Sequence, residues 1–197
     1  MNFSENISNK LTEVITNELN YSEDKKEIIA YAIETALLFV LGLFLIMLFG
    51  YALNALIPAL VAASSGGLLR RVSGGAHFKT PLKCMLFGSV AYGMIGVFVK
   101  QVIDYEWTNK SFLIISLFVS FLLIVFLAPV DSEAKPINSR SLRFKLKFSS
   151  MIFVIVLFLL IAFVDNKVFS ISAVLGVFYQ SMTLLPSFNR KGGGYRR

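Results

Sequence analysis

The chain has 197 residues, of which 56% are hydrophobic, and its mean hydropathy is +0.70. A soluble globular domain contains roughly 45–50% apolar residues, so this composition excludes an ordinary soluble domain and indicates a membrane protein. The net charge of +7 does not predict a nucleic-acid partner here, because the cations of a membrane protein chiefly set its orientation. A single cysteine excludes an internal disulfide.

The N-terminal segment, residues 1–27, is polar and lacks the apolar core of a cleavable signal peptide. Its apolar residues recur at helical spacing among acids and amides, which predicts an amphipathic helix: Ile7, Leu11, Val14, Ile15 and Leu19. Two placements are open for this helix. It either lies on the inner membrane surface or packs on the cytoplasmic face of the protein itself.

Six apolar segments follow, and they predict an all-α, polytopic membrane protein with six transmembrane helices: 28–50, 51–69, 82–99, 112–130, 148–164 and 168–185. The first two form one run whose only charge is Glu34, and we expect a tight turn between them at residues 50–54. Residues 28–189 are therefore predicted to form the membrane domain, and residues 190–197 form a basic tail.

The cations predict the orientation of these segments. Of the 19 Lys and Arg residues, only Lys100, Lys110 and Lys167 fall in the connections on one side of the membrane. Because cytoplasmic loops are enriched in Lys and Arg, we expect both termini and the connection around residues 70–84 to be cytoplasmic.

That connection, RRVSGGAHFKTPLKC, contains the only histidine and the only cysteine of the chain. In an unbroken helix His77 and Cys84 would lie about 10.5 Å apart along the axis, too far for proton transfer. The sequence predicts a break between them, because Pro81 suits the first position of a helix and Thr80 suits its N-cap. Two glycines, Gly74 and Gly75, allow a sharp turn before His77.

A cysteine one turn inside a helix N-terminus lies near unpaired N–H groups and the positive end of the helix dipole, which favour the thiolate. Lys83, Arg70 and Arg71 add positive potential, and His77 would complete a Cys–His pair able to attack an acyl group. Each residue type alone also has an ordinary explanation. A lone cysteine commonly fills space in a membrane helix, and a lone histidine in a basic loop is commonly solvated.

The arrangement of Arg70, Gly75, His77 and Cys84 between hydrophobic hairpins resembles the accessory gene regulator B (AgrB) family of bacterial membrane peptidases. The later stretch APVDSEAKPINSRSLRFKLKF, with Asp131 and Lys135, is also similar to a basic segment of that family. The resemblance implies a cysteine endopeptidase of the bacterial cell membrane. Its substrate would be an AgrD-like pro-peptide that matures into a cyclic quorum-sensing signal.

In the mechanism that the resemblance implies, Cys84 is the nucleophile and His77 is the base. The acidic C-terminal part of the precursor leaves, and an internal Cys or Ser closes a thiolactone or lactone from the acyl-enzyme. Glu34 or Asp131 is a candidate for orienting His77. Lys135 and the neighbouring basic residues would attract the acidic segment, although they serve equally well as positive-inside anchors.

Two other classes of function stay open from the residues alone: a small transporter or exporter, and a non-catalytic membrane assembly factor. One His and one Cys do not supply the three or four ligands that zinc requires, and no phosphate-binding glycine motif is present. We therefore expect no metal and no cofactor. The expected partners are the precursor peptide, the lipid bilayer and a second copy of the chain in a homodimer.

Overall fold

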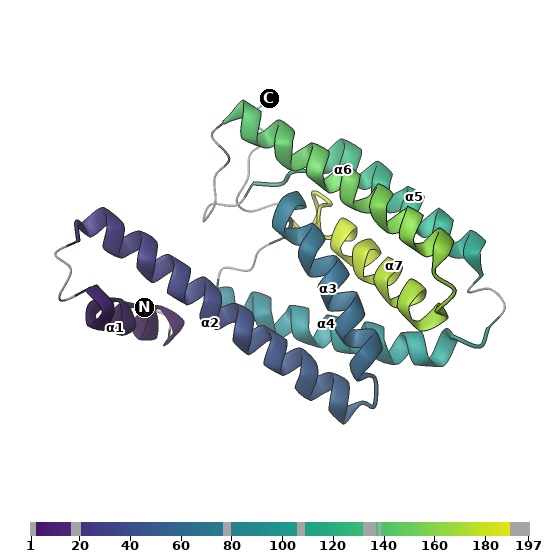
Figure 1. Ribbon diagram of the computed structural model, residues 1–197, viewed down its shortest axis with the longest axis horizontal. Helices are drawn as coiled ribbons and strands as arrows, with labels where there is room; N and C mark the ends of the chain where they lie inside the picture. Colours follow the sequence, from purple (N-terminus) through teal and green to yellow (C-terminus); the bar gives the residue numbers. More distant parts are fainter. Residues whose placement is uncertain are drawn as a thin grey trace.

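The computed structural model describes residues 3–16, 21–76, 80–105, 109–131, 137 and 139–189, with side chains from residue 6 onward. Within these residues the chain folds into seven helices and no strand (Figure 1): α1 (Phe3–Thr16), α2 (Glu23–Ala52), α3 (Leu56–Ser73), α4 (Pro81–Val102), α5 (Lys110–Leu127), α6 (Arg140–Phe163) and α7 (Lys167–Met182). The prediction of an all-α protein is therefore confirmed.

Each predicted apolar segment corresponds to one of the helices α2 to α7. The expected turn after the first segment forms at residues 53–55, where Asn54 adopts a positive φ of 52°. The largest difference lies at α6, which begins at Arg140 rather than near residue 148. The hydroxyl of Ser139 accepts a hydrogen bond from the N–H of Leu142 and caps this earlier start.

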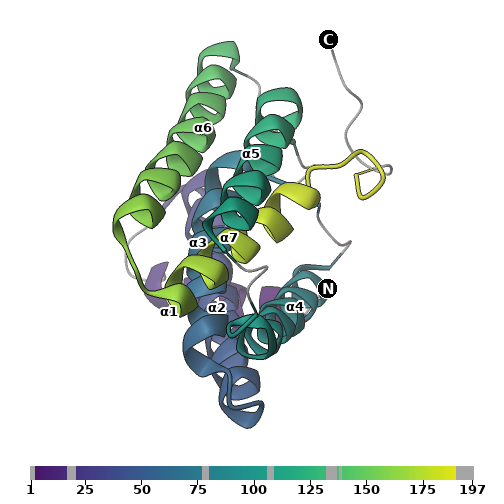
Figure 2. The same ribbon diagram turned by 90° about the vertical axis from the view of Figure 1, so that its right-hand side faces the viewer.

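Two short helices, α3 and α7, form the centre of the bundle and make the most extensive contact between any two helices. Helices α2 and α4 pack on one side of this pair, and α5 and α6 pack on the other (Figure 2). Val174 and Val177 of α7 and Leu69 of α3 are fully buried. The core therefore follows the α3–α7 contact.

Small residues allow α3 and α7 to approach closely. A Cβ atom on Gly176 would lie 2.2 Å from the carbonyl oxygen of Ala62, and one on Gly66 would lie 2.7 Å from the carbonyl oxygen of Gly176. Ser65 donates a hydrogen bond from its Oγ to the carbonyl of Ala173 across the same contact. Small residues and hydroxyl groups of this kind are typical of helix contacts in membranes.

The small residues of α4 also face neighbouring helices. Ser89 donates a hydrogen bond to the carbonyl of Gly42 in α2. A Cβ atom on Gly96 would lie 2.9 Å from the backbone of Ala59 in α3. These contacts dock α4 against both helices of the first hairpin.

Four helices are long and apolar enough to cross a membrane: α2, α4, α5 and α6. The other two predicted spans correspond to α3 and α7, which have 18 and 16 residues. Helix α7 is about 24 Å long at 1.5 Å per residue, short of a hydrocarbon core of about 30 Å. Helix α3 is as long as α5 but is less apolar, because it contains Arg70, Arg71 and several Ser and Gly residues. Among the described helices, four rather than six therefore have the length and composition of a span.

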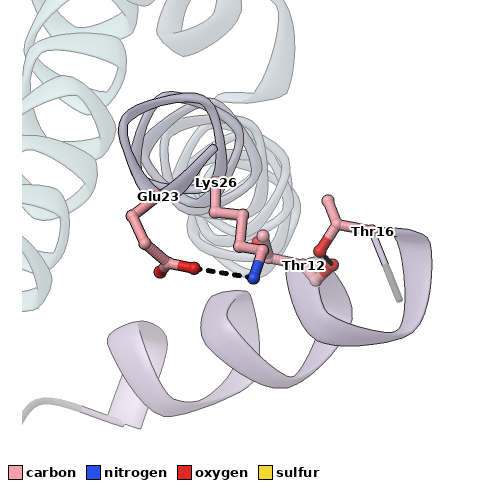
Figure 3. Close-up of polar contacts among 4 residues, drawn as sticks. All are labelled: Thr12, Thr16, Glu23 and Lys26. Atoms are coloured by element: carbon pink, nitrogen blue, oxygen red, sulfur yellow. Dashed lines mark hydrogen bonds and ion pairs between the residues drawn. The ribbon is translucent and has the colours of Figure 1, made fainter. Parts of the chain in front are cut away.

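The N-terminal helix α1 forms within the predicted segment and packs against α2 through its polar side. Ser8, Thr12 and Thr16 are buried there. The hydroxyl of Thr12 donates to the carbonyl of Ser8, and the hydroxyl of Thr16 donates to the carbonyl of Thr12 (Figure 3). Val14 and Ile15, in contrast, are 75% and 53% exposed. Helix α1 therefore packs on the protein through its hydroxyl groups, whereas Val14 and Ile15 of the predicted apolar stripe face outward. Leu19 lies outside the described residues.

Candidate active site

The predicted break between α3 and α4 is present. Helix α3 ends at Ser73, and the chain turns through Gly74 and Gly75, whose φ angles are +69° and +139°. Helix α4 then begins at Pro81, with Thr80 in extended conformation at the N-cap position. The side chain of Thr80 makes no capping hydrogen bond. Thr80 is therefore at the predicted N-cap position, but its hydroxyl does not cap the helix.

The turn segment, residues 73–76, is held by two distant parts of the chain. The N–H of Val130 donates to the carbonyl of Ser73 at 3.0 Å, and Gly74 pairs with Val130 in an isolated parallel bridge. The N–H of Ala76 donates to the carbonyl of Thr183 at 3.1 Å. The segment thus crosses between the end of α5 and the end of α7.

Cys84 is the fourth residue of α4 and is half-buried. Its N–H donates to the carbonyl of Thr80 at 3.3 Å, which closes the first turn of the helix. The thiol thus lies one turn inside the helix, as predicted.

Arg70 connects this thiol with the turn segment. Its Nη2 donates to the carbonyl of Ala76 and lies 3.5 Å from Sγ of Cys84. A single guanidinium nitrogen therefore contacts both the sulfur and the carbonyl of the residue that precedes His77 in the sequence. This contact places the positive charge of Arg70 beside the sulfur. A cation in this position would stabilise negative charge that develops on the sulfur during a reaction.

Two tyrosines lie behind Arg70 and Cys84, within electrostatic range of both. Tyr92 of α4 and Tyr179 of α7 meet edge to face, with ring centroids 5.5 Å apart and an interplanar angle of 78°. Tyr92 is 8% exposed.

The other predicted site residues are distributed around this centre. Arg71 is exposed and places its guanidinium over the ring of Phe39, 5.3 Å from the centroid. Lys83 is exposed, and Glu34 is half-buried in α2. The roles of these three residues in the site stay predictions.

Asp131 forms an ion pair with Arg143 of α6, while its second oxygen, Oδ1, is buried without a hydrogen-bond partner. His77 and Lys135 lie outside the described residues. The pairing of His77 with Cys84 and the orientation of His77 by Asp131 or Glu34 therefore stay predictions as well.

Sequence reasoning missed Gln180, a fully buried residue near the end of α7. Its Nε2 donates to the carbonyl of Gly74 at 2.7 Å and to the hydroxyl of Ser73 at 3.3 Å, and its Oε1 accepts from Nη1 of Arg70 at 3.4 Å. A signal for it exists in the sequence, because Gln180 interrupts the last apolar segment and polar groups inside such segments commonly serve a site.

A basic groove opens beside the turn segment, between the end of α5 and the start of α6. One side of the groove is the chain from Phe126 to Pro129. The other side consists of four cationic or aromatic residues of α6: Arg140, Arg143, Phe144 and Lys147. Its α5 side leads directly into Val130, the residue that pairs with Gly74. The groove and the Cys84 region are therefore linked through one short stretch of backbone.

The described residues contain no cluster of three or more His, Cys, Asp or Glu side chains able to hold a metal ion. The side chain that contacts Cys84 is a hydrogen-bond donor, the guanidinium of Arg70. Donors of this kind suit an anion or a carbonyl oxygen.

The fold defines a helical membrane protein whose only cysteine lies at a break between two helices. The family model for accessory gene regulator B matches residues 8–184, and the chain belongs to this family. Membership gives the chain a role in the accessory gene regulator quorum-sensing system.

Relatives in two genera support this assignment. The chain is 29% identical to "Putative AgrB-like protein 2" of Clostridium perfringens, over 91% of this chain and 90% of that relative. It is 34% identical to "Accessory gene regulator protein B" of Staphylococcus intermedius, over 74% of this chain and 76% of that relative. No solved structure matches the chain.

Proposed function

We propose that this protein is a membrane-embedded cysteine endopeptidase. It cleaves the C-terminal part of an AgrD-like pro-peptide through an acyl-enzyme thioester and promotes closure of a cyclic signal. Cys84 is the nucleophile and His77 is the base.

The contact of Arg70 with both Cys84 and Ala76 carries this proposal. Arg70 ties the sulfur to the carbonyl of Ala76, and the next residue in the sequence is His77. Because consecutive Cα atoms are about 3.8 Å apart, this tie supports an imidazole within reach of the thiol. A Cys–His pair activates the sulfur for acyl attack.

Cleavage then follows ordinary thiol-protease chemistry. His77 accepts the proton of the Cys84 thiol, and the sulfur attacks the scissile carbonyl carbon. The C–N bond breaks as a C–S bond forms, and the proton on His77 passes to the leaving amine. The products are a released C-terminal peptide and a thioester between the precursor and Cys84.

Ring closure uses the same groups in reverse. An internal thiol or hydroxyl of the precursor gives its proton to His77 and attacks the thioester carbonyl. The C–S bond to Cys84 breaks, and His77 returns the proton to the departing sulfur. Water has to be kept from the thioester, and the packed rings of Tyr92 and Tyr179, near enough to Arg70 and Cys84 to interact with them electrostatically, support such exclusion.

The basic groove supplies a surface for the acidic C-terminal segment of the precursor. Arg140, Arg143 and Lys147 provide positive charge there, and Phe126 and Phe144 provide apolar contact. The chain that lines the groove runs on into Val130, which pairs with Gly74 of the turn segment. This connection supports a bound segment that extends toward Cys84. Charge complementarity of this type chiefly sets encounter and specificity.

We further propose six spans, with α3 and α7 crossing inside the ring of the other four, and with both termini and the Cys84 region on the cytoplasmic side. The exposed apolar stripe of α1 supports a position in the inner membrane surface. A homodimer stays a prediction, to be measured as the mass of the protein in detergent micelles.

The test is co-expression of this chain with a candidate AgrD-like precursor peptide. Cys84→Ala and His77→Ala are expected to abolish cleavage while membrane insertion is unchanged. A thioester adduct should be detected by mass on the parent protein and be absent from Cys84→Ala. A transporter or an assembly factor would tolerate both substitutions, so full cleavage by either variant would contradict the proposal.

A further inference from the structure

Gln180 lies in α7, far along the chain from the proposed catalytic pair, and it is the buried residue that joins the separate parts of the site. It is 0% exposed, and Arg70, its hydrogen-bond partner, precedes it by 110 positions. A buried amide costs free energy unless its donors and acceptor are satisfied. All three hydrogen bonds of Gln180 described above go to the turn segment or to Arg70.

The amide nitrogen of Gln180 acts directly on the turn segment. It donates to the carbonyl of Gly74 at 2.7 Å and to the hydroxyl of Ser73 at 3.3 Å. A Cβ atom on Gly75 would lie 3.0 Å from the same nitrogen, so the backbone and the amide are packed against each other. This contact fixes the path of the chain toward His77.

The amide oxygen of Gln180 acts on the thiol through Arg70. It accepts a hydrogen bond from Nη1 at 3.4 Å, while Nη2 of the same guanidinium contacts Ala76 and Cys84. A planar guanidinium with fixed partners on both terminal nitrogens loses its rotational freedom. Gln180 therefore determines where the arginine holds its charge.

We propose that Gln180 is a positioning residue of the peptidase, with its nitrogen holding the turn segment and its oxygen orienting Arg70 toward Cys84. The proposal rests on the proposed function, because it assigns a role in the same reaction. Gln180 touches neither the substrate nor the sulfur. It acts through Gly74 and through Arg70.

Two substitutions separate the roles of the two amide atoms. Gln180→Met keeps the length of the side chain and removes both polar atoms. Gln180→Glu keeps an oxygen acceptor for Arg70 and removes the donor to Gly74. Ser181→Ala is a matched control, because Ser181 is also fully buried on α7 but donates only to the carbonyl of Phe178 in its own helix.

The readouts use the full-length protein in proteoliposomes. The first is the rate of cleavage of the candidate AgrD-like precursor peptide, separated into kcat and KM. The second is the rate at which iodoacetamide alkylates Cys84, which is specific because the chain has a single cysteine. Thermal unfolding in detergent is measured for every variant.

Gln180→Met is expected to lower kcat on the order of 100-fold, because a displacement of about 1 Å at reacting groups costs that much, with little change in KM. Its alkylation rate at pH 7 is expected to fall at least about threefold, because the sulfur loses a neighbouring cation. Gln180→Glu keeps Arg70 in place but adds a negative charge beside it, so its alkylation rate is expected to lie between those of the parent and Gln180→Met, and its kcat to fall about tenfold. Ser181→Ala should match the parent in both.

The proposal is overturned if Gln180→Met has the kcat and the alkylation rate of the parent. It is also overturned if, in all three variants, the losses in kcat and in alkylation rate simply follow the loss in melting temperature. If Gln180→Met does not fold, Gln180→Glu decides alone, since unchanged kcat in that variant removes the role of the nitrogen. If Cys84→Ala still cleaves the precursor, the proposed function fails instead. The alkylation rates then decide whether Gln180 positions Arg70.

Discussion

Gly75 occupies a backbone conformation that residues with a side chain rarely adopt. Its φ is +139°, a region that is essentially restricted to glycine. A Cβ atom there would also lie 2.5 Å from Oγ1 of Thr183 and 3.0 Å from Nε2 of Gln180. Gly75 is therefore required both by the turn before His77 and by the close packing of the turn segment against α7.

Gly75→Ala is expected to lower the free energy of unfolding by about 1–3 kcal/mol and to lower the rate of precursor cleavage, because the turn segment must shift. Thermal unfolding in detergent and a cleavage assay would measure the two effects. Gly67→Ala is the matched control, since a Cβ atom on Gly67 has no neighbour within 4 Å and alanine is favoured in a helix. Equal stability of the two variants would contradict the argument.

At the scale of the elements, the contact between α3 and α7 positions the site. Arg70 lies near the end of α3 and Gln180 near the end of α7, so their hydrogen bond depends on the spacing and rotation of these two helices. The spacing is set one helical turn before Gln180, where Gly176 approaches the carbonyl of Ala62. Packing between helices thus determines the geometry around the thiol.

Gly176→Ala is expected to push α7 away from α3, because the added Cβ atom would lie 2.2 Å from a backbone oxygen. We expect a loss of about 1–3 kcal/mol in the free energy of unfolding and an altered rate of Cys84 alkylation. Thermal unfolding and iodoacetamide kinetics measure these changes. Gly88→Ala, in the open surroundings of α4, should leave both values near those of the parent.

At the scale of the whole molecule, the cations are distributed asymmetrically along the chain. The described helices place Arg70 and Arg71 in the last turn of α3, and Arg140, Arg143 and Lys147 in the first two turns of α6. Lys100 lies at the opposite end of α4 from Cys84 and donates to the carbonyl of Asn54. This asymmetry predicts that Cys84 lies on the cytoplasmic side.

The single cysteine allows this orientation to be tested on the unmodified protein. A membrane-impermeant maleimide is expected to label Cys84 in inside-out vesicles and to leave it unlabelled in intact cells. A permeant maleimide should label it in both, which controls for the partial burial of the thiol. Cys84→Ala combined with Asn109→Cys should show the reverse pattern, and labelling of Cys84 from outside intact cells would refute the orientation.

Much of the fold is predictable from local features of the chain. The positions of the helices follow from apolar runs bounded by polar residues, and the break before α4 follows from Gly74, Gly75 and Pro81. The half-buried cysteine one turn inside α4 follows from the same local rules. Backbone preferences and hydropathy act over a few residues, so they are readable without the tertiary structure.

The sequence by itself determined the all-α class, the helix boundaries to within a few residues at most positions, and the candidate nucleophile. Only the tertiary structure decided that α3 and α7 lie at the centre, that α1 turns its hydroxyl groups toward α2, and that Gln180 and Arg70 meet. These features depend on which faces of distant helices pack together. Such packing results from the shapes of small residues and from hydrogen bonds that form between residues far apart in the chain.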